Sequence, residues 1–196
     1  RGTLATEREG FPEQPARAAF PALLAEAVER DWPQLAVAIF SAGLQPALLW
    51  LRAKRQLGGR DKALAALAEA GIAAEPSPLS AEALRLAEPS PVNQLPGFAD
   101  GALSVQDLSA QCAADALSPP AGARVLDACA APGGKSAHLL ERDPSLRLLA
   151  LDIDARRLAR AKDTYARTGV GEHVQTQVAD ASDTAAWWDR SERAHV

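Results

Sequence analysis

Methionine is absent from the 196 residues of this chain, and the sequence begins with Arg1 rather than with a start residue. The last ten residues, WWDRSERAHV, form a polar tail that carries no further strand or helix pattern. We therefore expect the chain to be a fragment from the interior of a longer protein.

Cysteine and long apolar runs are also scarce. The two cysteines, Cys112 and Cys129, allow at most one disulfide, and together with three scattered histidines they predict no metal site. No apolar stretch is long enough to cross a bilayer, and the first residues lack a signal-peptide pattern. These absences favour a cytoplasmic protein that binds neither membrane nor metal.

Positive charge is limited as well. Lys and Arg number 21 against 25 Asp and Glu, for a formal net charge of −4. This balance argues against binding nucleic acid by bulk electrostatics, although it leaves room for local basic patches. One candidate RNA surface is the face of the expected strand ALLWLRAKR (47–55) that carries Trp50, Arg52 and Lys54. A solvated strand face is an equally good interpretation of the same residues.

The first half of the chain predicts a small α+β domain. Residues 1–18 are polar and are expected to be a linker, and the domain is expected over 19–91. Helical periodicity extends over 20–41 and is divided at DWP (31–33), because the residue before a proline avoids helical geometry. A strand is expected over 47–55, a helix over 58–72 with Asp61 as its cap, and a strand over 83–87.

From residue 92 to 196 the pattern changes to alternating strands and helices. A helix is expected over 105–117, with Cys112 on its buried face. Strands over 124–129, 146–153 and 173–180 are separated by helices over 135–141 and 155–167, the second capped by Asp154 and ended by Gly169. Strand–helix alternation with short turns predicts a parallel, doubly wound sheet of the Rossmann-like α/β class.

The loop ACAAPGGKS (128–136) follows the first of these strands and is typical of a ligand-binding turn. A phosphate loop needs a glycine four residues before the Gly-Lys pair, and that position is Cys129. Pro132 also removes a backbone N–H that a phosphate loop would use. The adjacent pair Gly133 and Gly134 does not match the dinucleotide pattern either. A P-loop-like nucleotide-binding ATPase is therefore the weaker interpretation.

S-adenosylmethionine suits this loop better because it carries no phosphate. Gly133 and Gly134 allow close approach of the backbone to a ligand, and Lys135 is placed to pair with the methionine carboxylate. Asp152 ends the second strand, where such folds bind the ribose hydroxyls, and Asp180 ends the third strand, near the adenine. All of these positions meet at the carboxyl edge of the sheet.

These residues also carry a family resemblance. VLDACAAPGGKSAHLL together with LALDID closely resembles the bacterial 16S ribosomal RNA cytosine-5 methyltransferases of the Sun/RsmB type, and LPGFADGALSVQDLSAQ and LLWLRAKR are similar to segments of that family. The resemblance covers residues 20–189. It implies S-adenosylmethionine as cofactor, ribosomal RNA as partner, and methylation of carbon 5 of a cytosine. The cofactor contacts that it implies are Cys129, Ala130, Ala131, Pro132, Gly133, Gly134, Lys135, Asp152 and Asp180.

The resemblance implies no catalytic residue within these 196 residues. In that family a catalytic cysteine attacks carbon 6 of the base, and a second cysteine lies in an Asp-Ala-Pro-Cys loop after the fourth strand. Both motifs lie downstream of the third strand, so we expect the chain by itself to be inactive. Cys129 is expected to be a small buried residue with a backbone cofactor contact. A non-catalytic RNA-binding adaptor is a further alternative.

Overall fold

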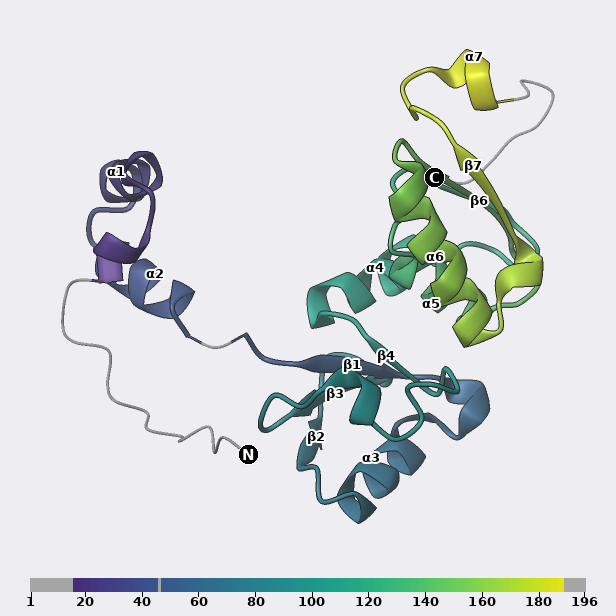
Figure 1. Ribbon diagram of the computed structural model, residues 1–196, viewed down its shortest axis with the longest axis horizontal. Helices are drawn as coiled ribbons and strands as arrows, with labels where there is room; N and C mark the ends of the chain where they lie inside the picture. Colours follow the sequence, from purple (N-terminus) through teal and green to yellow (C-terminus); the bar gives the residue numbers. More distant parts are fainter. Residues whose placement is uncertain (1–15, 46, 189–196) are drawn as a thin grey trace, which may run out of the picture. The chain divides into compact units, whose positions relative to one another are not determined.

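The chain divides after Ala47 into two units in the computed structural model, which describes residues 16–45 and 47–188 (Figure 1). Residues 1–15 of the predicted linker lie outside the described residues, and Ala16–Ala19 form a 3-10 helix, η1. Among the described residues, no helix has both the length and the apolar character needed to cross a membrane. No group of three or more potential metal ligands occurs in the same ranges.

The first unit contains two short helices, α1 (Ala22–Asp31) and α2 (Ala36–Gly43). They are separated at Trp32 and Pro33, which confirms the break predicted at DWP. Their small core consists of four buried residues with Phe20 packed against them, and the rings of Phe20 and Phe40 lie 5.2 Å apart. The buried residues are Ala25, Val28, Ala36 and Phe40.

The second unit begins with an antiparallel sheet in the order β2-β3-β1-β4. Its strands are β1 (Trp50–Ala53), β2 (Ala74–Pro76), β3 (Ala83–Leu86) and β4 (Leu103–Val105). Helix α3 (Gly59–Glu69) contacts β1, β2 and β3, and its buried Leu67 joins the apolar core of this sheet. The 3-10 turns η2 (Arg55–Leu57) and η3 (Val92–Gln94) complete the region.

Several predicted boundaries change in this part of the chain. Asp61 does not cap α3, because it lies within the first turn of the helix. The cap position is Gly58, which has a φ of 104° and no side-chain hydrogen bond. Strands β2 and β4 were not predicted, since three residues are too few to display an alternation. The helix expected from residue 105 begins instead at Leu108, as α4 (Leu108–Leu117). Asp107 caps its start, because its side chain accepts a hydrogen bond from the Ser109 N–H. Sheet pairing therefore continues past the predicted domain boundary at 91.

A parallel sheet in the order β5-β6-β7 follows, as the sequence predicted. Its strands are β5 (Arg124–Asp127), β6 (Arg147–Asp152) and β7 (Val174–Val178). Helices α5 (Gly134–Arg142) and α6 (Ala155–Thr168) connect them and lie beside the sheet in Figure 1. The 3-10 turn η4 (Gly171–His173) precedes β7, and α7 (Thr184–Trp187) follows it.

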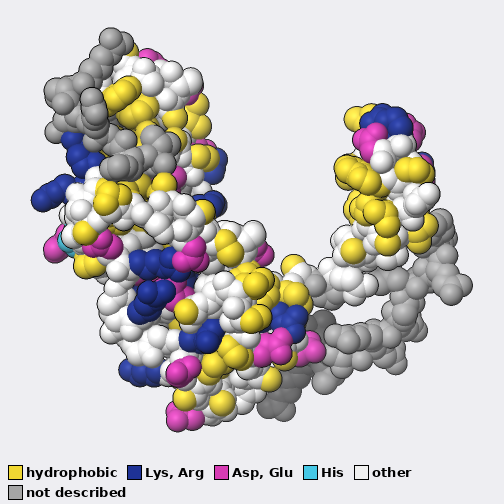
Figure 2. All heavy atoms as spheres, turned by 180° about the vertical axis from the view of Figure 1, so that it is seen from behind, with side chains coloured by type: hydrophobic (Ala, Val, Ile, Leu, Met, Phe, Trp, Pro, Cys, Tyr) yellow, Lys and Arg dark blue, Asp and Glu magenta, His cyan; other side chains and the backbone are white. Residues whose placement is uncertain are grey.

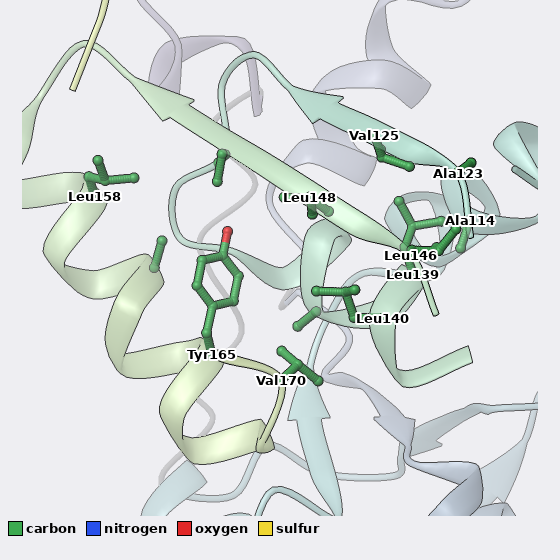
Figure 3. Packing of buried hydrophobic residues seen from close by; sticks show 14 residues of the cluster. Ala114, Ala123, Val125, Leu139, Leu140, Leu146, Leu148, Leu158, Tyr165 and Val170 are labelled. Carbon is green, nitrogen blue, oxygen red and sulfur yellow. The ribbon is translucent and has the colours of Figure 1, made fainter. Parts of the chain in front are cut away.

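The core of this region forms between the parallel sheet and the two connecting helices. Leu139 and Leu140 of α5, Tyr165 of α6 and Leu148 of β6 lie together in it (Figure 3). The predicted start and end of α6 are both confirmed: Asp154 accepts from the N–H groups of Arg156 and Arg157, and Gly169 is left-handed. The packing of α5 and α6 on the sheet also fixes where the loop before α5 lies relative to the strand ends.

A buried cluster of charges joins α5 to the antiparallel sheet. Glu82 is 3% exposed and accepts hydrogen bonds from Arg142 at 3.1 and 3.2 Å and from His138, and it also pairs with Arg55. Burial opposes ionisation of Glu82, but the hydrogen bonds from His138 and Arg142 outweigh it and lower its pKa to about 2. Burial lowers the pKa of His138, so the ring is neutral beside an ionised carboxylate.

These shifts predict a loss of stability in acid. The unfolded chain protonates His138 near its ordinary pKa of 6.5 and Glu82 near 4.5, whereas the folded chain resists both. Stability should therefore fall below pH 6.5 and fall further between pH 4.5 and about 2. Near neutral pH, Glu82→Gln should lower the free energy of unfolding by about 3 kcal/mol. Urea unfolding should show this difference from the wild type shrinking as the pH falls below 4.5.

The matched control is Glu75→Gln, which removes a carboxylate from an exposed ion pair with Arg85 on the same sheet. Exposed pairs contribute little, so this variant should follow the wild-type pH profile. A Glu82→Gln deficit that stays constant down to about pH 3 would show that the carboxylate is not the titrating group.

Candidate functional site

The carboxyl ends of the three parallel strands are bonded to one another at a single edge of the sheet. The Ala130 N–H, in the loop after β5, donates to the carbonyl of Leu151 in β6 at 2.8 Å. The Ala179 N–H, just after β7, donates to the carbonyl of Asp152 at 3.2 Å. Residues that follow three different strands are thus gathered at this edge, as the sequence predicted.

The two glycines of the loop have different roles. Gly133 has a φ of 92°, and its N–H donates to the carbonyl of Ala130 at 2.6 Å. A Cβ at Gly133 would lie 2.8 Å from the ring of Tyr165, so the fold itself requires glycine there. Gly134 opens α5 without a positive φ, and a Cβ there would have its nearest neighbour, Gln106 Nε2, 4.0 Å away. A Cβ at Gly134 would therefore fit without a clash.

Asp152 lies directly beneath this loop. Its Oδ2 accepts from the Ala131 N–H at 3.3 Å, and its Oδ1 accepts from the Asp154 N–H at 3.1 Å. Arg157 Nη2 lies 3.5 Å from the same Oδ2. Asp152 is 1% exposed, so this carboxylate is part of the packed interior. Asp152 therefore fixes the loop to the end of β6.

Asp127, at the end of β5, supports the loop from its other side. Its carboxylate accepts a hydrogen bond from Ser136 Oγ, in the first turn of α5, and a longer one of 3.4 Å from the Cys129 N–H. These contacts tie the end of β5 to the first turn of α5 and to the start of the loop. Tyr165, packed under Gly133, is the support that the sequence pattern did not reveal.

Both cysteines are exposed, contrary to expectation. Strand β5 ends at Asp127, so Cys129 lies in the loop rather than within the sheet, and its Sγ is 4.0 Å from Arg157 Nη2. On α4 the buried positions are Gln111 and Ala114, which turns Cys112 to the surface. The spacing of apolar residues suggested a face through Cys112, whereas the helix packs through the neighbouring face of Gln111 and Ala114.

The remaining loop and strand-end residues lie at the rim of the site. Pro132 and Lys135 are exposed, the latter in the first turn of α5. Asp180 is exposed two residues after β7, where hydrogen bonds from the hydroxyl and N–H of Ser182 lower its pKa. An ionised carboxylate and an ammonium are therefore available at this rim to polar groups of a ligand.

The expected RNA surface on β1 is not a solvent-facing surface. Arg52 is 1% exposed and forms an ion pair with Glu141 of α5, and Lys54 donates to the carbonyl of Thr168 at 2.5 Å. The expectation that Arg52 faces solvent or RNA is therefore wrong, and Trp50 beside it is half-buried. On the face drawn in Figure 2, Lys and Arg side chains stand next to Asp and Glu side chains.

Comparisons with known proteins agree with this arrangement. A family described as the RsmF/B-like methyltransferase ferredoxin-like domain matches residues 20–93, and one described as 16S rRNA methyltransferase RsmB/F matches residues 114–194. Ribosomal RNA small subunit methyltransferase B of Xanthomonas campestris is 52% identical over 93% of this chain, and that of Xylella fastidiosa is 54% identical over 93%. The chain spans 42% and 43% of the lengths of these two relatives.

Solved structures share the fold. A methyltransferase homolog from Pyrococcus horikoshii superimposes with a TM-score of 0.73 at 24% identity, over 90% of this chain and 59% of that one. NSun6 from Pyrococcus horikoshii with SFG gives a TM-score of 0.73 at 17% identity, over 86% of this chain and 67% of that one. At these identities the likeness is one of architecture.

The Rossmann-like methyltransferase class is defined by a parallel sheet flanked by helices, with a glycine loop after the first strand and a buried acid at the end of the second. In this chain a small α+β region precedes that sheet. This confirms the predicted fold class. The sequence identities and the two family matches then narrow the class: the chain belongs to the RsmB/F family of methyltransferases.

The contrast between the two glycines gives a direct prediction. Gly133→Ala should destabilise the chain by about 1–3 kcal/mol, because alanine is strained at positive φ and meets the Tyr165 ring. Gly134→Ala should be as stable as the wild type, or up to about 1 kcal/mol more stable, because alanine favours helix. Urea unfolding of both variants measures this, and equal destabilisation would contradict the geometry.

Proposed function

We propose that this sequence carries the S-adenosylmethionine site of an enzyme that methylates carbon 5 of a cytosine in 16S ribosomal RNA. The observation that carries the proposal is the bond between the glycine loop and the buried acid, in which Asp152 accepts the Ala131 N–H. The glycine loop is thereby held next to a carboxylate that can accept from ribose hydroxyls. Such an enzyme works on ribosomes and would be cytoplasmic.

The residues around the loop suit the parts of this cofactor. The backbone from Cys129 to Gly134 would line the adenosine and methionine, and Lys135 would pair with the methionine carboxylate. Asp152 would accept from the ribose hydroxyls, and Asp180, at the rim, would contact the adenine. Arg157 is exposed and lies over Asp152, so its side chain would swing aside when a ribose binds.

The division of labour follows from the chemistry of the methyl donor. S-adenosylmethionine supplies an electrophilic methyl group when it is bound. This chain's residues would hold and orient that donor, excluding water from its buried side through the packed loop and Asp152. Cys129 is at the loop, and we propose that it lines the cofactor site rather than attacking a base. We assign no catalytic residue among the described residues.

A nucleotide-binding ATPase fits the same loop less well. The buried carboxylate of Asp152 lies beneath the loop, where it would repel a triphosphate. The predicted outcome of calorimetry is therefore binding of S-adenosylmethionine and no measurable binding of magnesium–ATP. Tight binding of magnesium–ATP with no response to S-adenosylmethionine would overturn the proposal in favour of the phosphate-loop alternative.

The ribose role of Asp152 predicts a specific loss of affinity. Asp152→Asn keeps the size of the side chain and one acceptor oxygen but removes the charge, so it should weaken S-adenosylmethionine binding by about 1–3 kcal/mol. The matched control is Asp163→Asn, an exposed aspartate on α6, which should bind like the wild type. Calorimetry at a temperature where all three proteins give the same circular dichroism separates affinity from folding. Unchanged affinity in a folded Asp152→Asn protein would remove this role.

The methylated base can be tested in cells. Deleting the gene that encodes this sequence should remove a 5-methylcytosine from 16S ribosomal RNA, as read by bisulfite sequencing. Restoring the gene should bring the mark back, and restoring it with Asp152→Asn should give less modification at equal protein level. A deletion strain with an unaltered pattern of 5-methylcytosine in 16S ribosomal RNA would refute the substrate assignment.

A further inference from the structure

A buried arginine of the antiparallel sheet contacts the glycine loop. Arg52, on β1, donates from Nη1 to the carbonyl oxygen of Gly134 at 3.0 Å, across a sequence separation of 82 residues. That carbonyl belongs to the first residue of α5, immediately after Gly133. The contact therefore connects the small sheet to the part of the chain that we propose binds the cofactor.

The guanidinium of Arg52 is held in a fixed orientation. Its Nε and Nη2 donate to the two carboxylate oxygens of Glu141 at 3.1 and 2.9 Å, and its Nη1 also donates to Gln106 Oε1. The side chains of Arg52 and Glu141 are 1% and 4% exposed. A bidentate arginine–carboxylate pair fixes the plane of the guanidinium, and with it the direction of the donor aimed at Gly134.

The partner Gln106 is fixed in its turn. Its N–H donates to the carbonyl of Trp50 at 3.2 Å, and its own carbonyl accepts from Gln111 Nε2 at 2.9 Å. Gln111 is fully buried and also donates to the carbonyl of Leu51 at 3.2 Å. The donor at Gly134 is therefore anchored, through Gln106 and Gln111, to the backbone of β1 at the two residues that precede Arg52.

Such an anchor matters because the loop contains two glycines in succession. Glycine has the largest backbone freedom of any residue, so the turn into α5 depends on its contacts to keep one conformation. The Gly133 carbonyl is held from within the turn, by the Ala137 N–H at 2.9 Å. Tyr165 packs against Gly133 and Asp127 holds Ser136, but Gly134 has no side chain to fix. The hydrogen bond from Arg52 is the contact that restrains its carbonyl from outside the parallel-sheet region.

We propose that Arg52 is a positioning residue that holds the glycine loop in its ligand-binding conformation, which makes the antiparallel sheet a working part of the cofactor site. This rests on the proposed function, that S-adenosylmethionine binds at the loop. Arg52 does not touch the ligand in this proposal. It acts through Gly134, so its removal weakens binding by loosening the loop.

The test separates positioning from stability. Removing Arg52 alone would leave Glu141 as an unpaired buried charge, so the test variant is the double replacement Arg52→Met with Glu141→Leu, which removes both charges. Gln106 Oε1 loses its donor in this variant. The probe is S-adenosylhomocysteine, titrated calorimetrically into the 196-residue chain. We expect a dissociation constant raised about tenfold, as for the loss of one charge-assisted hydrogen bond that orders a site. Hydrogen exchange of residues 130–136 without ligand should also become faster.

Two controls keep the outcome interpretable. Arg85→Met removes an arginine of the same sheet whose ion pair with Glu75 is partly exposed and distant in sequence from the loop. Leu67→Ala destabilises the core of the sheet and leaves Arg52 and its partners in place. Both should bind S-adenosylhomocysteine like the wild type and keep the loop's exchange rate, even where Leu67→Ala unfolds at lower urea.

Arg52→Lys gives a second route should the double variant fail to fold. Lysine keeps a positive charge for Glu141, but a single ammonium cannot hold two carboxylate oxygens in the same bidentate plane and also fix Gly134. It should show the same faster exchange at the loop and a weaker affinity.

The outcomes are distinct. Wild-type affinity and loop exchange in the double variant or in Arg52→Lys would overturn the positioning role, as would an equal loss of affinity in Leu67→Ala. Absence of binding by the wild-type chain itself would instead refute the proposed function. In that case, faster hydrogen exchange of the loop in the Arg52 variants would still show that Arg52 restrains the loop, but not that this restraint serves binding of this ligand.

Discussion

Buried charge must be paired, and this constraint organises the second unit of the chain. Arg52, Glu82, Glu141 and Asp152 are each almost entirely buried, and each has partners that match it. Leaving one such group unpaired costs several kcal/mol, about as much as a small domain can lose. The antiparallel sheet, α5 and the strand ends therefore hold one another in a single arrangement.

Two of these charged groups, Arg52 and Glu82, reach α5 from the antiparallel-sheet region. The first carbonyl of α5 accepts from Arg52, and Glu141 in its last turn receives the same guanidinium. His138 and Arg142 of the same helix reach Glu82 on the antiparallel sheet. One face of α5 thus makes polar contacts with the antiparallel sheet, where a packed helix face would ordinarily make apolar ones. Directional bonds of this kind specify position more strictly than apolar packing does, because they fail when the helix slides or turns.

The sequence predicted the parallel-sheet part well because its signals are local. Strands β5, β6 and β7, the helix boundaries at Asp154 and Gly169, and the gathering of Asp152 with the glycine loop all follow from spacing and strand order. Arg52 could not be placed in this way. Its alternation on β1 gives a face but says nothing about what covers that face, and its partner Glu141 lies 89 residues further along the chain.

The same limit explains the errors at the two cysteines. A strand that ends two residues before Cys129 leaves the thiol outside the sheet, and α4 packs through Gln111 and Ala114, which leaves Cys112 on its outer face. In both cases the element was correct and its end was not. Exposure near a strand's end depends on that boundary, whereas a residue in mid-strand, such as Ala150, keeps its side under either boundary.

The loop's supports also bear on how a ligand would bind there. Tyr165, Asp127, Asp152 and Arg52 each fix a different part of the loop, from the core, from two strand ends and from the neighbouring sheet. A loop already ordered by its own chain loses little further conformational entropy when a ligand arrives. The free energy of the new contacts is then available for affinity. The buried polar contacts of the loop can therefore serve binding even where they add little net stability. They keep a glycine-rich segment in one conformation.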